Sequence, residues 1–229
     1  MILIRPSNRK GRGPRKEEML SNRSALSELL SLAWPAVLQG LLLTVVFLTD
    51  RTLLGHYHAD GLGVVQICGP ALWSLFSLSG SLDIGALALM GRARGRGDDR
   101  GVINLLRSCS LFSFGIGTLI FALSPWLTEW LIMWMGRETP ELHQSARLYF
   151  FPLFLSAPLK MLGGLFFSAL QSQGDTKTPM WISGVCGFTN LGLSALLIYG
   201  WGGAPELGIA GAAWGSAFAF TLQAALGGW

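Results

Sequence analysis

Six long apolar stretches constrain this chain more than any other feature of its sequence. A helix needs about 20 apolar residues to cross the ~30 Å hydrocarbon layer of a bilayer, and each stretch is about that long or longer. In lipid, only helices and closed barrels satisfy every backbone polar group, and uninterrupted runs of this length specify helices. The sequence therefore predicts an all-α, polytopic integral membrane protein with six transmembrane helices. The stretches run from about Leu29 to Leu54, Gly63 to Met90, Val102 to Leu123, Leu148 to Leu170, Met180 to Tyr199 and Leu207 to Leu226.

Charged residues are few, and most of them lie between the apolar stretches. They make up 13% of the chain, against roughly 25% in ordinary soluble proteins. Thirteen cations fall in the amino-terminal segment and in or beside the loops after the second and fourth stretches, whereas three fall on the other side. Because cytoplasmic segments carry the excess of Lys and Arg, we expect a cell (inner) membrane protein with a cytoplasmic amino terminus. Residues 1–25 are expected to be a basic, disordered cytoplasmic arm.

The cysteines and histidines form no pattern that is typical of a metal site. Cys68, Cys109 and Cys186 lie singly in apolar stretches, and we expect them to be small buried hydrophobes. The loop after the first stretch contains two histidines and an aspartate, but their spacing suits no known ligand set and predicts a solvated loop. These three residues are His56, His58 and Asp60.

The sequence also predicts no enzymatic activity. The run 91–98 is rich in glycine and arginine, but no strand precedes it and no Lys-Ser or Lys-Thr pair closes it, so it does not match a phosphate-binding loop. No serine, histidine and acid combination indicates a nucleophile. We therefore expect no catalytic residues, no metal, no cofactor and no nucleic-acid partner.

Three ionisable residues, Asp50, Asp83 and Lys160, lie inside the apolar stretches. An ionisable group in a bilayer is costly enough to make each one a functional candidate. For Asp83 the alternative is a structural pair with Arg92 or Arg94 in the following loop. The neutralising partner of Lys160 would be Asp83 or Asp50.

Asp50 shares one face of its predicted helix with two further residues. Pro35 precedes it by fifteen positions and Gln39 by eleven, so at 100° per residue both lie within about 60° of it. The face thus combines a proline, an amide and a carboxylate. A carboxylate in a low-dielectric environment can exchange a proton near neutral pH. The alternative is that Asp50 only pairs with the adjacent Arg51 at the outer interface.

Several segments resemble the multidrug and toxic compound extrusion (MATE) transporters, in the order in which that family has them. The first helix has the proline and the late aspartate before a glycine, and the connection between the fourth and fifth helices is the most specific match. The resemblance covers the chain from about Leu29 to its end. The segments are Leu32–Val37, Phe47–Gly55, Gly85–Asp98, Ala169–Met180 and Pro205–Gly215.

The resemblance implies one lobe of a twelve-helix transporter with two related lobes. Residues 26–229 would be the amino-terminal six-helix lobe, with the carboxy-terminal lobe absent. Such transporters export bulky, often cationic drugs by alternating access, in exchange for protons or sodium ions. Because repeat-built transporters place their sites around the repeat interface, one lobe alone would lack half of the substrate cavity.

The resemblance also assigns roles to residues of this chain. Asp50 matches the acidic position that binds the coupling ion, and Asn190 matches a polar residue of the same cavity. Ser194 stands where some members carry a second aspartate, so coupling through a pair of acids is in question here. Pro35 matches the helix-bending proline, which would leave the carbonyl of Ser31 without its hydrogen bond.

Two alternatives to drug export stay open at the level of sequence. A related flippase for lipid-linked sugars or peptidoglycan precursor would share the architecture, but such proteins usually line the cavity with several arginines, and these spans contribute little more than Lys160. A truncated membrane protein that does not transport is the second alternative. The expected partners are the lipid bilayer, a small organic cation, and either the missing lobe or a second copy of the chain.

Overall fold

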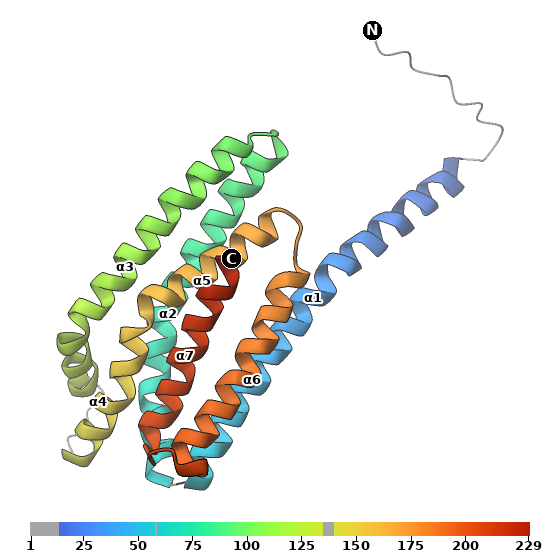
Figure 1. Ribbon diagram of the computed structural model, residues 1–229. Coiled ribbons are helices and arrows are strands. Elements are labelled where there is room, and N and C mark those ends of the chain that lie inside the picture. The colour runs from blue at the N-terminus through green and yellow to red at the C-terminus, as the bar shows by residue number, and fades with distance from the viewer. Residues whose placement is uncertain (1–13, 58, 135–139) are drawn as a thin grey trace.

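The computed structural model describes the backbone of residues 14–57, 59–134 and 140–229. These residues form helices and connecting turns, and no strand occurs among them (Figure 1). The elements are α1 (Pro14–Tyr57), α2 (Ala59–Gly95), α3 (Asp99–Trp134), α4 (Pro140–Leu155), α5 (Ala157–Ser172), α6 (Lys177–Tyr199), the 3₁₀ turn η1 (Trp201–Gly203) and α7 (Ile209–Gly227).

Within the described ranges, five helices are individually long and apolar enough to cross a membrane. Helices α4 and α5 meet the same criterion as one span that is bent by 46°. The predicted all-α membrane fold is confirmed, and the fourth span, expected as one helix over about 148–170, consists of two helices that meet at a bend. Pro158 explains the break, because it has no N–H to donate to the preceding turn. Its backbone also packs directly against Gly117 of α3, where a side chain would collide with it.

Several helices extend further than the sequence pattern indicates. Helix α1 begins at Pro14, so residues 14–25 continue the first helix, whereas the sequence predicted a disordered arm there. More than half of this segment is Arg, Lys, Glu, Met, Leu or Ala, which favour helix even where they are not apolar. Helix α3 likewise runs to Trp134, well beyond the expected end near Leu123. Apolar patterning missed the polar start of α1, whereas residues 124–134 of α3 are largely apolar and continue the helix through Pro125.

Small residues on α7 allow close packing against α6. The buried face of α7 consists mainly of alanine and glycine, and a Cβ atom at Gly211 would lie 2.6 Å from the backbone carbon of Leu197. Helix α1 lies along the other side of α6, where Gly187 faces Val46. Close approach over small residues is the usual basis of helix association in membranes. Gly40 has no neighbouring atom within 4 Å, so it does not serve such a contact.

The packed interior lies where α4 and α7 meet α2 and α3. Phe150 and Phe154 are fully buried there beside Leu72, Ile132 and Ala213. By contrast, all nine tryptophans are exposed, the least of them at 39%. An apolar surface of this extent would be unfavourable in water, whereas it suits contact with lipid chains and headgroups.

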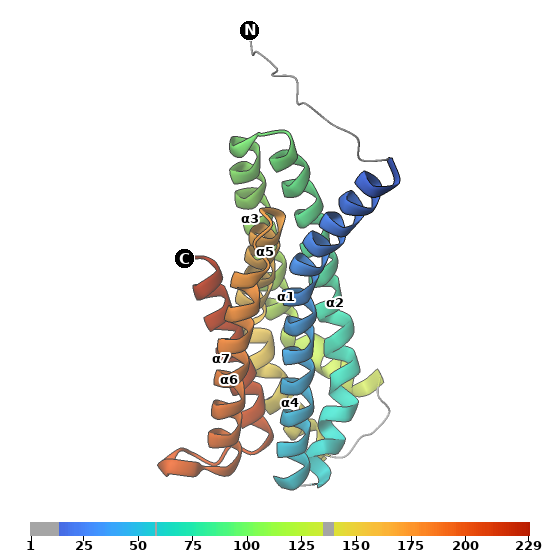
Figure 2. The same ribbon diagram turned by 90° about the vertical axis from the view of Figure 1, so that its right-hand side faces the viewer.

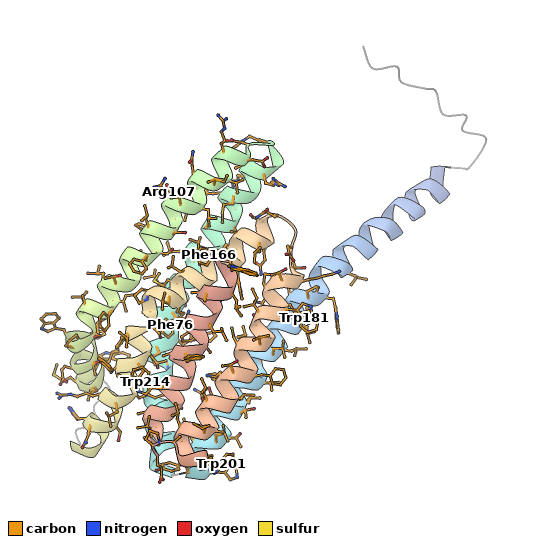
Figure 3. The ribbon with its side chains drawn as sticks, viewed as in Figure 1. Phe76, Arg107, Phe166, Trp181, Trp201 and Trp214 are labelled. Carbon is orange, nitrogen blue, oxygen red and sulfur yellow. The ribbon has the colours of Figure 1, made fainter. Side chains whose placement is uncertain are left out.

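The connections alternate between the two ends of the helix bundle. The α2–α3 turn, the α5–α6 turn and the carboxy terminus lie at the end from which α1 projects (Figures 1 and 2). The α1–α2 turn and the α6–α7 connection lie at the opposite end. Arg107 lies toward the first end and Trp201 at the second (Figure 3). The cations of the α2–α3 and α5–α6 turns thus lie at one end of the bundle.

Candidate functional site

A cavity of about 460 Å³ lies between α1, α2, α4 and α7. Its volume falls in the range of about 300–1,000 Å³ that is typical of sites for small organic molecules. The wall is mostly aromatic and aliphatic, with one carboxylate and one guanidinium. The lining residues are Phe47, Asp50, Arg51, Leu54, Gly69, Pro70, Leu72, Trp73, Phe76, Tyr149, Leu153, Ala212, Ser216 and Phe220.

The carboxylate in this wall belongs to Asp50 of α1, and it faces the amide of Asn190 on α6. In the amide orientation that gives both ends of Asn190 a partner, its nitrogen donates to Oδ2 of Asp50 at 3.1 Å. Its oxygen then accepts hydrogen bonds from the backbone N–H and the hydroxyl of Ser216, each at 3.1 Å. The buried amide thereby links the carboxylate of α1 to α7 through α6.

Ser194 lies one turn after Asn190 on α6 and is fully buried. Its hydroxyl lies close to the Asp50 carboxylate, but Oγ completes no hydrogen bond of standard geometry within the described part of the chain. Gly215 of α7 packs against this hydroxyl, and a side chain there would collide with it. Asp50, Asn190 and Ser194 thus meet at one place, together with Ser216.

The other two residues of the predicted α1 face lie away from the cavity. Gln39 donates a hydrogen bond from Nε2 to the hydroxyl of Ser183 on α6 at 3.0 Å. Pro35 is buried within a continuous α1. A rise of 1.5 Å per residue places it about 22 Å along the helix from Asp50. Gln39 therefore lies on the contact between α1 and α6, and neither Gln39 nor Pro35 lines the cavity.

Asp83 and Lys160 form a second charged group behind the aromatic wall. The two charges attract each other, and the Asp83 carboxylate packs against Gly164, one turn after Lys160 on α5. The Lys160 ammonium lies 4.4 Å from the ring centroid of Phe76 and 5.6 Å from that of Phe220. Both rings line the cavity, so the aromatic layer separates the ammonium from it. Of the two partners considered for Lys160, the structure favours Asp83.

Neither Arg92 nor Arg94, the alternative partners for Asp83, forms an ion pair with it in the described part of the chain. Arg94 forms an ion pair with Asp99 at the α2–α3 turn, so it does not neutralise Asp83. Asp99 is the first residue of α3 and Arg94 lies in the last turn of α2. This pair stabilises the turn between the two helices.

The histidines and cysteines, which the sequence did not favour as a metal site, form no such site among the described residues. His56 lies in the last turn of α1, where Nδ1 is 2.8 Å from the carbonyl oxygen of Thr52. His58 and the side chain of Asp60 lie outside the described residues. Among the described residues, no three metal-ligating side chains gather. Cys186 is buried and Cys109 half-buried, both as free thiols, and the side chain of Cys68 is not described.

Sequence reasoning missed two residues of the cavity wall, Arg51 and Ser216. Arg51 was interpreted only as a flanking cation or as a partner of Asp50, although its position next to Asp50 places it one helical step around α1. Ser216 directly follows Gly215, and the glycines at 211 and 215 are spaced by one helical turn. That spacing is a signal for a helix face in close contact with a neighbour, from which Ser216 could have been placed near α6.

Comparison with known proteins assigns the chain to a family. The MatE family model matches residues 35–196. The chain belongs to the MatE family. Among curated relatives, it is 29% identical over 198 residues to a probable multidrug resistance protein NorM of Thermotoga maritima, a match that covers 86% of this chain and 42% of the relative. The multidrug resistance protein PmpM of Pseudomonas aeruginosa is 29% identical over 194 residues, covering 84% and 40%.

Solved structures of MATE proteins have the same fold. A MATE crystal structure in the bent conformation matches with a TM-score of 0.78 and 20% identity, covering 87% of this chain and 44% of the other. An outward-facing MATE transporter of the MOP superfamily matches with a TM-score of 0.79 and 21% identity, covering 86% and 43%. The chain thus spans less than half the length of the MatE relatives it matches, and it is an integral membrane protein with the architecture of one lobe.

Proposed function

We propose that this chain is the amino-terminal lobe of a secondary active transporter that exports bulky organic molecules. In this proposal, Asp50 binds the coupling ion, a proton, and releases it when the substrate enters the cavity. The observation that carries the proposal is the placement of the Asp50 carboxylate in the cavity wall, in contact with Asn190. An ion and a substrate can then compete for one carboxylate.

The aromatic side chains of the cavity wall favour a flat organic molecule as the substrate. Phe47, Trp73, Phe76 and Phe220 line the cavity together, and aromatic rings bind planar molecules and cations through their faces. A lipid-linked sugar presents many hydroxyl groups, whereas most of the side chains in this wall are apolar and only one of them is an arginine. Drug export therefore fits the cavity better than a flippase for lipid-linked sugars.

The second lobe, or a second copy of this chain, would close the remaining side of the cavity. In the proposed cycle, protonated Asp50 loses its attraction for a cationic substrate and α1 changes its contact with α6. The Gln39–Ser183 hydrogen bond lies on that contact, and Pro35, one turn earlier on α1, weakens the helix backbone. The basic end of the bundle is proposed to face the cytoplasm, because it carries the excess of Lys and Arg.

Efflux from cells that produce the protein from its own gene tests this function. With the protein present, we expect active efflux of ethidium that depends on external pH. Asp50→Asn should abolish that dependence and reduce efflux by about tenfold or more, because the side chain keeps its shape but no longer exchanges a proton.

Glu129→Gln serves as the control, since Glu129 pairs with Arg147 on the exposed surface and lies outside the cavity wall. Its efflux should equal that of the unmodified protein. Unchanged, pH-dependent efflux by Asp50→Asn would rule out the proposed role of this carboxylate.

A further inference from the structure

Arg51 occupies an unusual position for a cation in a membrane-spanning helix. It is half-buried and lines the cavity. Its guanidinium carbon lies 3.6 Å from the centroid of the Phe47 ring, one turn earlier on α1. A cation held over an aromatic face is stabilised, and the stacking fixes the plane of the guanidinium group. The group is thereby oriented within the cavity wall.

Arg51 and Asp50 are neighbours in sequence, but their side chains diverge toward different helices. The Asp50 carboxylate faces Asn190 on α6. The Arg51 guanidinium instead reaches α2, where Nη2 would lie 3.0 Å from a Cβ atom at Gly69. Because Gly69 has no side chain, the guanidinium can lie against the α2 backbone. The cavity wall therefore contains two separated charges of opposite sign.

The hydrogen-bonding capacity of Arg51 is largely unused by the described residues. A guanidinium has five N–H donors in a planar fork. Arg51 has the ring contact with Phe47 and the electrostatic attraction of Asp50, but it makes no hydrogen bond and no close ion pair with the rest of the described chain. Lys160, the other cation near this region, is already balanced by Asp83 and screened by the aromatic layer. Among the residues that the structure describes, Arg51 is thus the cation that is available to a molecule in the cavity.

We propose that Arg51 forms a subsite for an anionic group of the substrate, foremost a carboxylate. A guanidinium fork binds a carboxylate through two parallel hydrogen bonds. With Asp50 in the same wall, the cavity would select molecules that carry an anionic and a cationic group on one aromatic frame. The inference rests on the proposed export function and specifies its substrate class.

A matched pair of dyes tests the subsite. The probes are a rhodamine with a free carboxylate, which is zwitterionic at neutral pH, and the cationic methyl ester of the same dye. Their binding to the full chain in lipid nanodiscs is measured by fluorescence anisotropy at neutral pH. Arg51→Gln should weaken binding of the carboxylate dye by roughly tenfold, the effect of losing one charge-assisted hydrogen-bond pair. Binding of the ester should stay within about twofold, because no carboxylate is lost.

Two further variants test whether the effect depends on the planar shape of the Arg51 side chain and on its position in the cavity wall. Arg51→Lys keeps the charge but not the planar fork, so it should retain part of the preference for the carboxylate dye. Arg147→Gln is the matched control, since Arg147 pairs with Glu129 on the exposed surface and does not line the cavity. It should leave both affinities unchanged.

The outcomes distinguish this inference from the proposed function. If Arg51→Gln weakens both dyes equally, or neither, the anion subsite is overturned, whatever the effect of Asp50→Asn. If Asp50→Asn changes neither dye while Arg51→Gln acts on the carboxylate dye alone, the subsite stands and the role of Asp50 fails. Failure of both dyes to bind the unmodified chain would overturn both.

Discussion

At the scale of single residues, two charged side chains from one turn of α1 extend toward different helices, and both belong to the cavity wall. Asp50 extends to Asn190 of α6, and Arg51 extends to Gly69 of α2. The buried Asn190 amide is held by Ser216, so hydrogen bonds connect the Asp50 carboxylate to α7. Ser194 supplies a further hydroxyl close to this carboxylate.

A residue outside the membrane has a titration that can be measured separately. Asp175, in the α5–α6 turn, accepts hydrogen bonds through Oδ1 from the backbone N–H groups of Lys177 and Thr178, at 3.1 Å and 3.0 Å. A hydrogen bond from the Thr178 side chain, together with these backbone donors, lowers the pKa of Asp175 below its usual value. The charged carboxylate therefore stabilises the start of α6.

Asp175→Ala is predicted to lower the thermal midpoint of unfolding at neutral pH by the equivalent of about 1 kcal/mol. Because the folded pKa is lowered, this contribution is complete above the unfolded value of about 3.9 and is lost as the pH falls through the folded value. The difference between the two proteins should therefore be constant from neutral pH down to about pH 5 and then shrink below about pH 4.

Asp175→Asn provides the control for this measurement, because its side-chain oxygen still accepts hydrogen bonds but does not titrate. Midpoints are followed by tryptophan fluorescence in detergent. A difference between Asp175→Ala and the unmodified chain that keeps its size at pH 3 would contradict the assignment.

At the scale of the elements, the sequence predicted the apolar centre of each span. It was less informative about where the helices end and where they bend. Length and hydropathy locate α6 and α7 closely, since their ends coincide with the change from apolar to polar residues. The break at Ser156 was missed, although Pro158 was visible, because a membrane helix can absorb a proline with or without bending. The neighbouring helix decides the outcome, and here Gly117 of α3 provides the space for the bent segment.

The site residues could also be predicted only in part, because their contacts depend on neighbouring helices. Asp50 could be predicted because an acid within an apolar stretch is costly, and the contact of Asp50 with Asn190 agrees with the resemblance. Arg51 could not be placed, because sequence does not indicate whether a cation near a helix end extends to the interface or into the bundle. The Asp83–Lys160 pairing depended on the packing of α2 against α5.

Close packing of α6 against α7 allows a prediction with an internal control. A Cβ atom at Gly211 would lie 2.6–2.7 Å from backbone atoms of Leu197 and Ile198, so Gly211→Ala must push the two helices apart. We expect a loss of about 2 kcal/mol in the free energy of unfolding. It is measured as a lower thermal midpoint, together with loss of the monodisperse peak in size-exclusion chromatography.

Gly192, on α6, has no atom within 4 Å of its would-be Cβ. Gly192→Ala should therefore leave the free energy of unfolding unchanged or raise it by about 0.5–1 kcal/mol, the difference in helix propensity between the two residues. Equal effects of the two substitutions would show that the α6–α7 contact is not as close as described.

At the scale of the whole molecule, the described helices form one lobe of the MatE architecture, with its cavity bounded by α1, α2, α4 and α7. The lobe contains a carboxylate, a guanidinium and an aromatic wall at one place. It also contains a continuous α1 whose contact with α6 uses small residues and one hydrogen bond between side chains. In the proposed function, these parts couple an ion to a substrate.

Proton release on substrate binding tests that coupling most directly. The purified chain, in weakly buffered detergent solution without sodium, is mixed with the cationic rhodamine ester while a pH indicator is followed. The account predicts that release rises toward about one proton per bound dye as the pH falls below the pKa of the unliganded site. Asp50→Asn should release none, and Asp175→Asn should behave as the unmodified chain. Equal proton release by Asp50→Asn and the unmodified chain would contradict the central claim that Asp50 exchanges its proton for the substrate.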